Sequence, residues 1–452
     1  MAAAPTSREI EHAFPSAKNG GDSGGLPAIS RHASTRGILL GLSLFAFAVH
    51  LLFLGLLPNR WSQNESTDYF LFYEPVAHNL IEGKGLVTSD GHPALRYPPG
   101  QPLILAGLME SARITGLPEA LVFRAFIALV VMIVPILIYK ITAAVFDQGI
   151  ALLSSVLFAA YPFYLWLTKQ PNSEIPFFLL FFAVLYIFVR SIEAQCFTAW
   201  HGLTIGGLIG IASLIRPIVL ALSGVFLLAL WLCQKRWTIR QRIVFSLLLV
   251  LGNALVVLPW EVWAREKTGQ WILLSTNGPP SIVDGLTFAV KERPSNNVLP
   301  VSPELGVLMQ EVRDRSGQLQ SVAAIGGLLV RKFRQEPVAV TKLIVLKMSR
   351  AWYATDSQSH ERWIVFFQAP CILFSVIGGV AAVKTGGGPR RLALLMLLVT
   401  CYFWLMTTIG LSILRYMVPA MGLLMPFASL GIIAVGRRLW KPQHFWYQMD
   451  RL

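Results

Sequence analysis

The sequence is poor in charged residues. Asp, Glu, Lys and Arg make up 14% of the 452 residues, whereas soluble proteins carry about a quarter. Hydrophobic residues account for 54% of the chain, and they fall in repeated runs close to the roughly 20 residues that cross a hydrocarbon core. This composition excludes an ordinary soluble domain and predicts an integral membrane protein. Continuous apolar runs, rather than weak alternation, favour a helical bundle over a barrel.

Cysteine is also scarce. The four cysteines, Cys196, Cys233, Cys371 and Cys401, lie within or at the edges of apolar runs, and no pair has metal-ligand spacing. We interpret them as small core residues, so neither a zinc site nor a disulfide is predicted. No cofactor is predicted; a divalent cation is compatible with the sequence but is not implied by it.

The net charge is +14, but the basic residues are scattered in short clusters between the apolar runs. Such clusters are typical of membrane topology signals, so nucleic acid is not a predicted partner. The segment 101–110 decides the topology, because it is short, follows Pro98 and Pro99, and ends at Glu110. If it lies at the interface or re-enters without crossing, the clusters after later segments all fall on the side of the N-terminus, which is then cytoplasmic.

We therefore predict about ten transmembrane helices, with both termini in the cytoplasm. The predicted spans are 37–57, 119–139, 150–167, 175–189, 202–215, 217–233, 243–262, 364–383, 392–412 and 416–436. The expected fold is an all-α polytopic membrane protein, with interfacial helices in the first outer loop and a mainly helical outer-face region before the last three spans.

The predicted domains follow from this topology. They are a disordered cytoplasmic tail (1–36), a transmembrane module (37–262) that includes the first outer loop (58–118), an outer-face region (263–362), C-terminal transmembrane helices (363–436) and a second cytoplasmic tail (437–452). In the outer-face region, the motifs Asn277-Gly278-Pro279-Pro280 and Asp284-Gly285 indicate turns. Residues 317–352 have the pattern of two amphipathic helices, broken near Pro337 and resting on the outer membrane surface.

Charged residues gather at the predicted outer face. Asp68 and Glu174 come from different outer loops, and Arg96, Arg216 and Arg415 lie at the same level. Charges kept against a bilayer indicate that a polar group is handled there. In transfer of a sugar from a polyprenyl phosphate, a carboxylate can accept the proton of the attacking hydroxyl while arginines hold the phosphate. We therefore predict that the first outer loop forms one half of an active site and that the loop carrying Glu174 contributes to the other half.

Ordered short motifs support this interpretation. The first outer loop carries Asp68-Tyr69, Ala77-His78-Asn79-Leu80, Gly83-Lys84-Gly85 and Tyr97-Pro98-Pro99-Gly100-Gln101-Pro102-Leu103. Later come Ser173-Glu174, Arg216-Pro217, Pro259-Trp260, Gly269, Ser275-Thr276-Asn277-Gly278 and Arg415-Tyr416. In this order, over roughly residues 40–436, the motifs resemble the glycosyltransferase C superfamily. They are most similar to its protein O-mannosyltransferase-like branch, which includes the lipid A aminoarabinose transferases (a family 39-like membrane protein).

The resemblance implies roles for single residues. Asp68 matches the first-loop acidic residue that serves as base or orients the acceptor, and Glu174 matches the second-loop carboxylate, which lies near the first. Arg96 is similar in placement to a basic residue that contacts the donor phosphate. We therefore predict that Asp68 is the base, that Glu174 orients acceptor or donor, and that Arg96, helped by Arg415, holds the phosphate. Tyr97, Arg216, Arg265 and Glu74 are supporting candidates, with Glu74 in reserve should Asp68 fail. The sequence departs from its relatives beside Asp68, where Thr67 and Tyr69 stand instead of a second acid, and after Pro259-Trp260, where Arg265 comes late.

Structural roles compete with these assignments. Asp68 could cap a helix that starts at Tyr69, and Glu174 could be a first-turn acid favoured by the helix dipole. Arg96 could bind lipid headgroups, while Arg216 and Arg415 could satisfy carbonyl groups at helix ends. The aromatic residues Tyr69 and Tyr73 have the pattern of an interfacial belt.

The predicted function is an integral-membrane glycosyltransferase with an inverting single displacement. It would move a sugar, a hexose or a pentose, from a polyprenyl-phosphate donor to a lipid, glycan or protein hydroxyl. The active site would lie on the outer, periplasmic face of a bacterial inner membrane, and module 37–262 would be catalytic. A transporter or lipid-linked sugar flippase is the alternative, although no inverted repeat is visible; a non-catalytic assembly subunit is a third hypothesis.

Overall fold

The molecule is built from helices. The computed structural model describes residues 35–56, 68–194, 197–290, 300–358 and 360–439, and within these ranges every regular element is a helix. The predicted all-α class of a multi-pass membrane protein is confirmed. Most of the two predicted tails, together with loop residues 57–67, lies outside the described residues, although the first helix already begins at Thr35.

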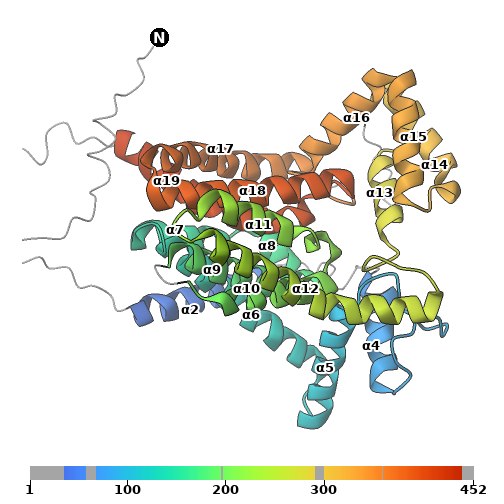
Figure 1. The fold of residues 1–452 in the computed structure, drawn as a ribbon, viewed down its shortest axis with the longest axis horizontal. Coiled ribbons are helices and arrows are strands. Elements are labelled where there is room, and N and C mark those ends of the chain that lie inside the picture. The colour runs from blue at the N-terminus through green and yellow to red at the C-terminus, as the bar shows by residue number, and fades with distance from the viewer. Residues whose placement is uncertain (1–34, 57–67, 195–196, 291–299, 359, 440–452) are drawn as a thin grey trace, which may run out of the picture.

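Ten helical segments correspond to the ten predicted spans. Seven are long and apolar enough to cross a membrane: α2 (Thr35–Leu56), α6 (Glu119–Ala143), α9 (Glu174–Glu193), α12 (Ile239–Thr268), α17 (Glu361–Thr385), α18 (Gly387–Ile409) and α19 (Val418–Leu439). Three are shorter apolar helices: α7 (Gln148–Ala159), α10 (Ala199–Ile215) and α11 (Leu222–Cys233), the last preceded by the single turn η2 (Pro217–Val219). Side by side they form the bundle of Figure 1.

The predicted span 150–167 is not one helix. It is divided into α7 and a short helix, α8 (Pro162–Leu167). Tyr161 stands before Pro162 and has an extended backbone (φ −70°, ψ 116°), because the proline ring disfavours the helical conformation of the preceding residue. The prediction of a single helix was wrong at this point.

The first loop and the later helical region gather at one end of the bundle (Figure 1). The loop holds the π-helical turn η1 (Tyr69–Tyr73), α4 (Glu74–Ile81) and α5 (Gly100–Thr115). Helix α5 is not among the membrane-crossing candidates, in agreement with the predicted interfacial role of 101–110. At its first residue, a Cβ on Gly100 would overlap the carbonyl group of Leu214, so the start of α5 packs directly on the end of α10. We call this end of the bundle the site end.

The later region has its own hydrophobic core. It contains α13 (Gly278–Leu286), α14 (Pro303–Asp314), α15 (Val322–Gln335) and α16 (Pro337–Arg350). The two helices predicted around Pro337 are present as α15 and α16. The turns predicted at 277–280 and 284–285 are instead the start and interior of α13, because prolines are well tolerated in the first helical turn. Buried side chains of all four helices form one cluster.

Close helix contacts rely on glycine. A Cβ on Gly206 of α10 would overlap the carbonyl oxygen of Leu249 in α12, and one on Gly378 of α17 would overlap that of Phe427 in α19. Small residues permit this approach between apolar helices in a membrane. The two tight pairs hold α10 and α19, the helices next to Arg216 and Arg415, in place.

A buried lysine joins the α13–α16 region to the bundle. Lys347 of α16 is 2% exposed, and its Nζ donates hydrogen bonds to the carbonyl oxygens of Gly410 (2.9 Å) and Ile409 (3.3 Å) at the end of α18. Burial lowers the pKa of this amine to about 7. A neutral amine has two hydrogens to donate, which matches the two carbonyl acceptors.

Stability should therefore depend on pH through Lys347. The unfolded chain keeps this proton up to about pH 10.5, whereas the folded protein releases it above about pH 7, so the free energy of unfolding rises with pH between these values. We expect the melting temperature of Lys347→Met in detergent to lack this component and to exceed wild type most at pH 6. Lys342→Met, an exposed change on the same helix, should follow wild type. Parallel pH profiles for wild type and Lys347→Met would refute the assignment.

Candidate active site

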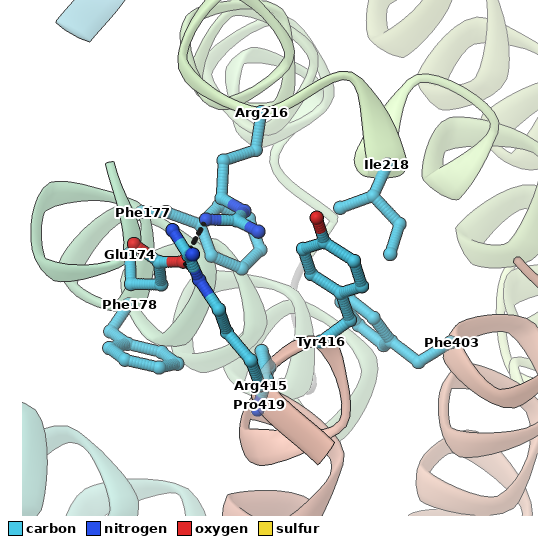
Figure 2. A pocket seen from close by; sticks show the side chains of 9 residues that line it. All are labelled: Glu174, Phe177, Phe178, Arg216, Ile218, Phe403, Arg415, Tyr416 and Pro419. Carbon is cyan, nitrogen blue, oxygen red and sulfur yellow. Dashed lines mark hydrogen bonds and ion pairs between the residues drawn. The ribbon is translucent and has the colours of Figure 1, made fainter. Parts of the chain in front are cut away.

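A buried carboxylate with two arginines lies at the site end. Glu174, the first residue of α9, has a side chain that is 2% exposed. Its Oε1 accepts from Arg216 Nη1 at 2.6 Å and from Arg415 Nε. Arg216 Nη1 also donates to Ser173 Oγ at 3.0 Å. Figure 2 shows the carboxylate held between the two guanidinium groups.

The local sequence explains why these three residues meet. Arg216 ends α10 with an extended backbone because Pro217 follows it. Arg415 lies in the turn η4 (Leu414–Tyr416), just before α19. The N-terminus of α9 also favours a carboxylate through the helix dipole. Three helix ends therefore place one negative and two positive groups at one level of the bundle.

The electrostatics of this ionic cluster leave it with an excess of one positive charge. The ring of Tyr416 stacks on Arg216, with 5.1 Å between Cζ and the ring centroid. Burial opposes the charge on Arg415, but Glu174 and Asp68 outweigh this effect and raise its pKa above the usual value. Arg415 is thus held charged beside the carboxylate, and a buried carboxylate needs such a partner to offset its desolvation.

Asp68 is held next to this cluster by a tyrosine. Tyr97 Oη donates to Asp68 Oδ1 at 2.7 Å, and Asp68 is half-buried. Burial, and then the charge of Asp68, raise the pKa of Tyr97 far above its usual value, so Tyr97 remains a donor. The electrostatic influence of Asp68 reaches Arg415 and Tyr416, so both carboxylates belong to one polar centre.

Tyr73 links the two halves of this centre. It is 4% exposed, interacts with Ser173, and feels the charges of Asp68 and Arg216. Sequence analysis assigned Tyr69 and Tyr73 to an interfacial belt, but the structure buries both of them in the core of the first loop. The π-helical turn that carries them is a local irregularity of the kind that often occurs at functional sites.

A small cavity lies beside the ionic cluster. Its volume is about 10 Å³, close to the minimum for one water molecule. Aromatic rings, among them Phe177, Phe178 and Phe403, share its wall with Glu174 and the arginines (Figure 2). The cavity is too small to hold a sugar.

A strained loop supports the segment that carries Tyr97. Leu274 has a left-handed backbone (φ 61°), and Glu261 Oε1 accepts from its N–H at 2.7 Å while Trp260 Nε1 donates to its carbonyl at 2.9 Å. Two residues on, the Thr276 N–H donates to the Leu95 carbonyl at 2.9 Å. Strain held by such partners is common next to functional sites. Sequence analysis had singled out the motif Pro259-Trp260, which contains one of these partners. It had not singled out Glu261 or Leu274.

Comparison with known proteins agrees with this architecture. Residues 97–263 match the family model of dolichyl-phosphate-mannose-protein mannosyltransferases. The chain superposes on the Archaeoglobus fulgidus oligosaccharyltransferase in complex with an inhibitory peptide and a dolichol-phosphate, with a TM-score of 0.55, 12% identity, and coverage of 92% of this chain and 51% of that one. For the apo form of the same enzyme the TM-score is 0.54 at 12% identity, with 94% and 52% covered.

The chain therefore shares its fold with the archaeal oligosaccharyltransferase, and residues 97–263 match the mannosyltransferase family model. The resemblance predicted from the sequence is thereby confirmed. The chain spans about half the length of the archaeal enzyme that it matches, and no curated protein sequence matches it significantly.

The predicted site residues divide into two groups in the structure. Asp68, Glu174, Arg216, Arg415 and Tyr97 lie together. Arg96 is exposed and stacks on Tyr97, with 5.4 Å between Cζ and the centroid. Arg265 is exposed and stacks on Trp271 at 4.6 Å, and Glu74 accepts from Tyr69 Oη at 3.3 Å.

The structural alternatives can be compared with this geometry. Asp68 makes no capping hydrogen bond to the turn that begins at Tyr69. Arg216 and Arg415 bind a carboxylate and not the carbonyl groups of helix ends. In the described part of the chain, no group of three His, Cys, Asp or Glu side chains has the arrangement of a metal site.

Proposed function

We propose that the protein transfers a sugar from a polyprenyl-phosphate donor to a hydroxyl group of a lipid, glycan or protein. The observation that carries the proposal is the polar centre at the site end, in which a half-buried carboxylate, Asp68, lies beside the ion-paired arginines Arg216 and Arg415. Charges of both signs, kept at a helix end beside an apolar bundle, suit a reaction on an anionic lipid.

The proposed reaction is a single displacement with inversion. The acceptor oxygen attacks the anomeric carbon, and Asp68 takes the hydroxyl proton as a general base. The bond between the anomeric carbon and the phosphate oxygen breaks, so the donor phosphodiester leaves as a phosphate monoester. One negative charge thus moves from Asp68 to the phosphate, and groups placed to stabilise that charge lower the barrier.

Arg415 is the group best placed to meet this charge. Glu174 engages its Nε, and among the described residues its terminal nitrogens Nη1 and Nη2 have no acceptor. Its side chain is 28% exposed, against 10% for Arg216. Arg415 can therefore present two N–H groups to a phosphate while Glu174 holds it in position, and guanidinium groups bind phosphate in this paired manner. Arg96, exposed at the mouth of the loop, is a second contact for the same phosphate.

The surrounding elements receive roles under the same proposal. The α13–α16 region would form a wall for the acceptor, because it stands over the site end (Figure 1). The site end would face the periplasm of a bacterial inner membrane, since the basic loops then lie in the cytoplasm.

A transfer assay tests the proposal. Purified protein is supplied with a panel of labelled polyprenyl-phosphate sugars and a membrane extract, and the labelled product is identified. We expect label transfer from one donor class, dependent on Asp68. Absence of transfer from every donor, combined with movement of labelled lipid across vesicles, would favour a transporter or flippase.

Removing the Tyr97 hydroxyl should slow transfer. Tyr97→Phe keeps the packing of the ring but deletes the hydrogen bond that orients Asp68. A hydrogen bond to a charged group contributes about 1.5–3 kcal/mol, so we expect kcat/KM to fall roughly tenfold or more. Tyr69→Phe, which removes a hydroxyl that contacts Glu74 in the same loop, should have a smaller effect. Equal losses in the two variants would count against a special role of the Tyr97 contact.

A further inference from the structure

A second cavity lies at the other end of the bundle from the ionic cluster. Helix α9 begins at Glu174 and ends at Glu193, and a helix of 20 residues is about 30 Å long. The cavity is lined at the last turns of α9 and α11, the following loop, and the first turns of α18. Its volume is about 400 Å³, within the usual range of small-molecule sites.

Four basic side chains line this cavity: Lys235, Arg236, Arg390 and Arg391. Arg391 is neutralised by Glu193, with a bond of 3.0 Å from Nε to Oε1 and a second one from Nη2 to Oε2. Lys235 Nζ donates to the carbonyl of Trp231 at 3.2 Å. Within the described chain, no carboxylate forms an ion pair with Lys235, Arg236 or Arg390. The cavity therefore carries about three uncompensated positive charges.

The frame of the cavity is rigid. Gln234 is 2% exposed; its Nε2 donates to the Ile192 carbonyl at 2.9 Å, and its Oε1 accepts from the Arg236 N–H at 2.9 Å. This side chain fixes the loop after α11 on the end of α9, while the pair of Arg391 and Glu193 fixes α18 there. Basic side chains on a fixed frame lose less conformational freedom when they bind a ligand.

The position of Arg390 has no explanation within the protein. It lies in the first turn of α18, where the helix dipole disfavours a cation, and it faces a cavity that already holds two other cations. A bound anion would offset both the unfavourable helix dipole and the repulsion from the neighbouring cations. The topology rule alone accounts for basic residues near a span, but it does not require them to surround one cavity.

The cavity is amphiphilic. Leu232, one of its lining residues, is 50% exposed, and Ile192 and Leu394 also line it. An anionic headgroup could lie among the basic side chains while its acyl chains leave past Leu232. Basic pockets between membrane helices bind anionic headgroups in this way.

We propose that this basic cavity binds a phosphate-bearing anion, the headgroup of an anionic phospholipid, at the end of the bundle away from the polar centre. The site is independent of the transfer reaction, because about 30 Å of helix separates it from Glu174. Phosphate has two sources here, a membrane lipid or a soluble ion, and the half-exposed Leu232 favours the lipid.

The test compares thermal stability and lipid retention, and uses no activity. The full chain is placed in phosphatidylcholine nanodiscs with increasing phosphatidylglycerol, and retained lipid is counted by native mass spectrometry. The variant Lys235→Gln with Arg390→Gln should bind phosphatidylglycerol at least tenfold more weakly than wild type. The control, Arg240→Gln with Lys384→Gln, removes two exposed basic residues that do not line the cavity, and it should behave as wild type.

Three outcomes would overturn the proposal or its choice of ligand. Equal loss in both double variants would mean general surface attraction and no site. Unchanged binding in the cavity variant would also remove the site. Inorganic phosphate in pure phosphatidylcholine could raise the melting temperature of wild type as phosphatidylglycerol does, and leave that of the cavity variant unchanged. The ligand would then be a soluble anion, and the lipid assignment would be wrong. Should the double variant fail to fold, Arg236→Gln alone, an exposed loop change, gives the same comparison.

Discussion

Replacing Asp68 by asparagine is expected to abolish sugar transfer while the protein still inserts and folds. The amide keeps an oxygen that can accept from Tyr97 Oη, so the contact at 2.7 Å and the local packing survive. What disappears is the ability to take a proton, and loss of a general base costs about 10²–10⁴-fold in rate. Transfer is measured with labelled donor, and folding by the melting temperature in detergent.

The control is Asp90→Asn, which changes an exposed carboxylate of the same loop. It should leave transfer within about twofold of wild type, as surface changes away from a site usually do. Normal turnover by Asp68→Asn would sink the assignment of the base and would favour a transporter or a non-catalytic subunit. Glu74→Gln would then be the next variant to examine, because Glu74 is the nearby reserve carboxylate.

Replacing Glu174 by glutamine should damage both stability and transfer. The carboxylate is the shared partner of Arg216 and Arg415, and its neutralisation leaves the buried Arg216 and the partly exposed Arg415 without a counter-charge. Breaking a buried pair by removing one partner costs about 3–5 kcal/mol. We expect a melting temperature lowered by several degrees, together with loss of transfer because Arg415 is no longer held in position.

A double variant separates electrostatics from packing. Adding Arg415→Gln to Glu174→Gln removes one of the uncompensated charges. The double variant should therefore lose less stability than the sum of the losses in the two single variants. Additive losses would show that the charge balance is not what stabilises the cluster. Asp68→Asn is the companion measurement, since it should lower transfer without this loss of stability.

Much of the fold could be predicted because a bilayer imposes strong periodic constraints. The ten apolar segments, a helix over 101–110 that is not a membrane-crossing candidate, and the break at Pro337 all follow from segment length and proline chemistry. Helix α13 was missed because Asn277-Gly278-Pro279-Pro280 has the same residues as a turn, and packing against α14 and α15 decides between the two. The break before Pro162 was missed because its neighbours are uniformly apolar.

The sequence predicted that the site residues lie at the same side of the membrane, but it did not predict which of them contact one another. Sequence analysis placed Asp68, Glu174, Arg216 and Arg415 on one face, which the structure brings together. It gave Glu174 an orienting role and did not pair it with either arginine, since those contacts cross 42 and 241 residues and no local pattern encodes them. The burial of Tyr73 and the left-handed Leu274 depend on tertiary partners, so they also left no local signal. The catalytic roles of the site residues stay predictions.

The contact between Glu174 and Arg415 has a consequence for how the chain is made. Arg216 is synthesised soon after Glu174, but Arg415 follows about 200 residues later, which takes roughly 10–40 s of translation at about 5–20 residues per second. During that interval the carboxylate must enter the membrane with a single guanidinium partner. The polar centre is therefore completed by the arrival of α19, and a nascent chain stalled before it would expose a carboxylate with only one of its two guanidinium partners to the quality control of the insertion machinery.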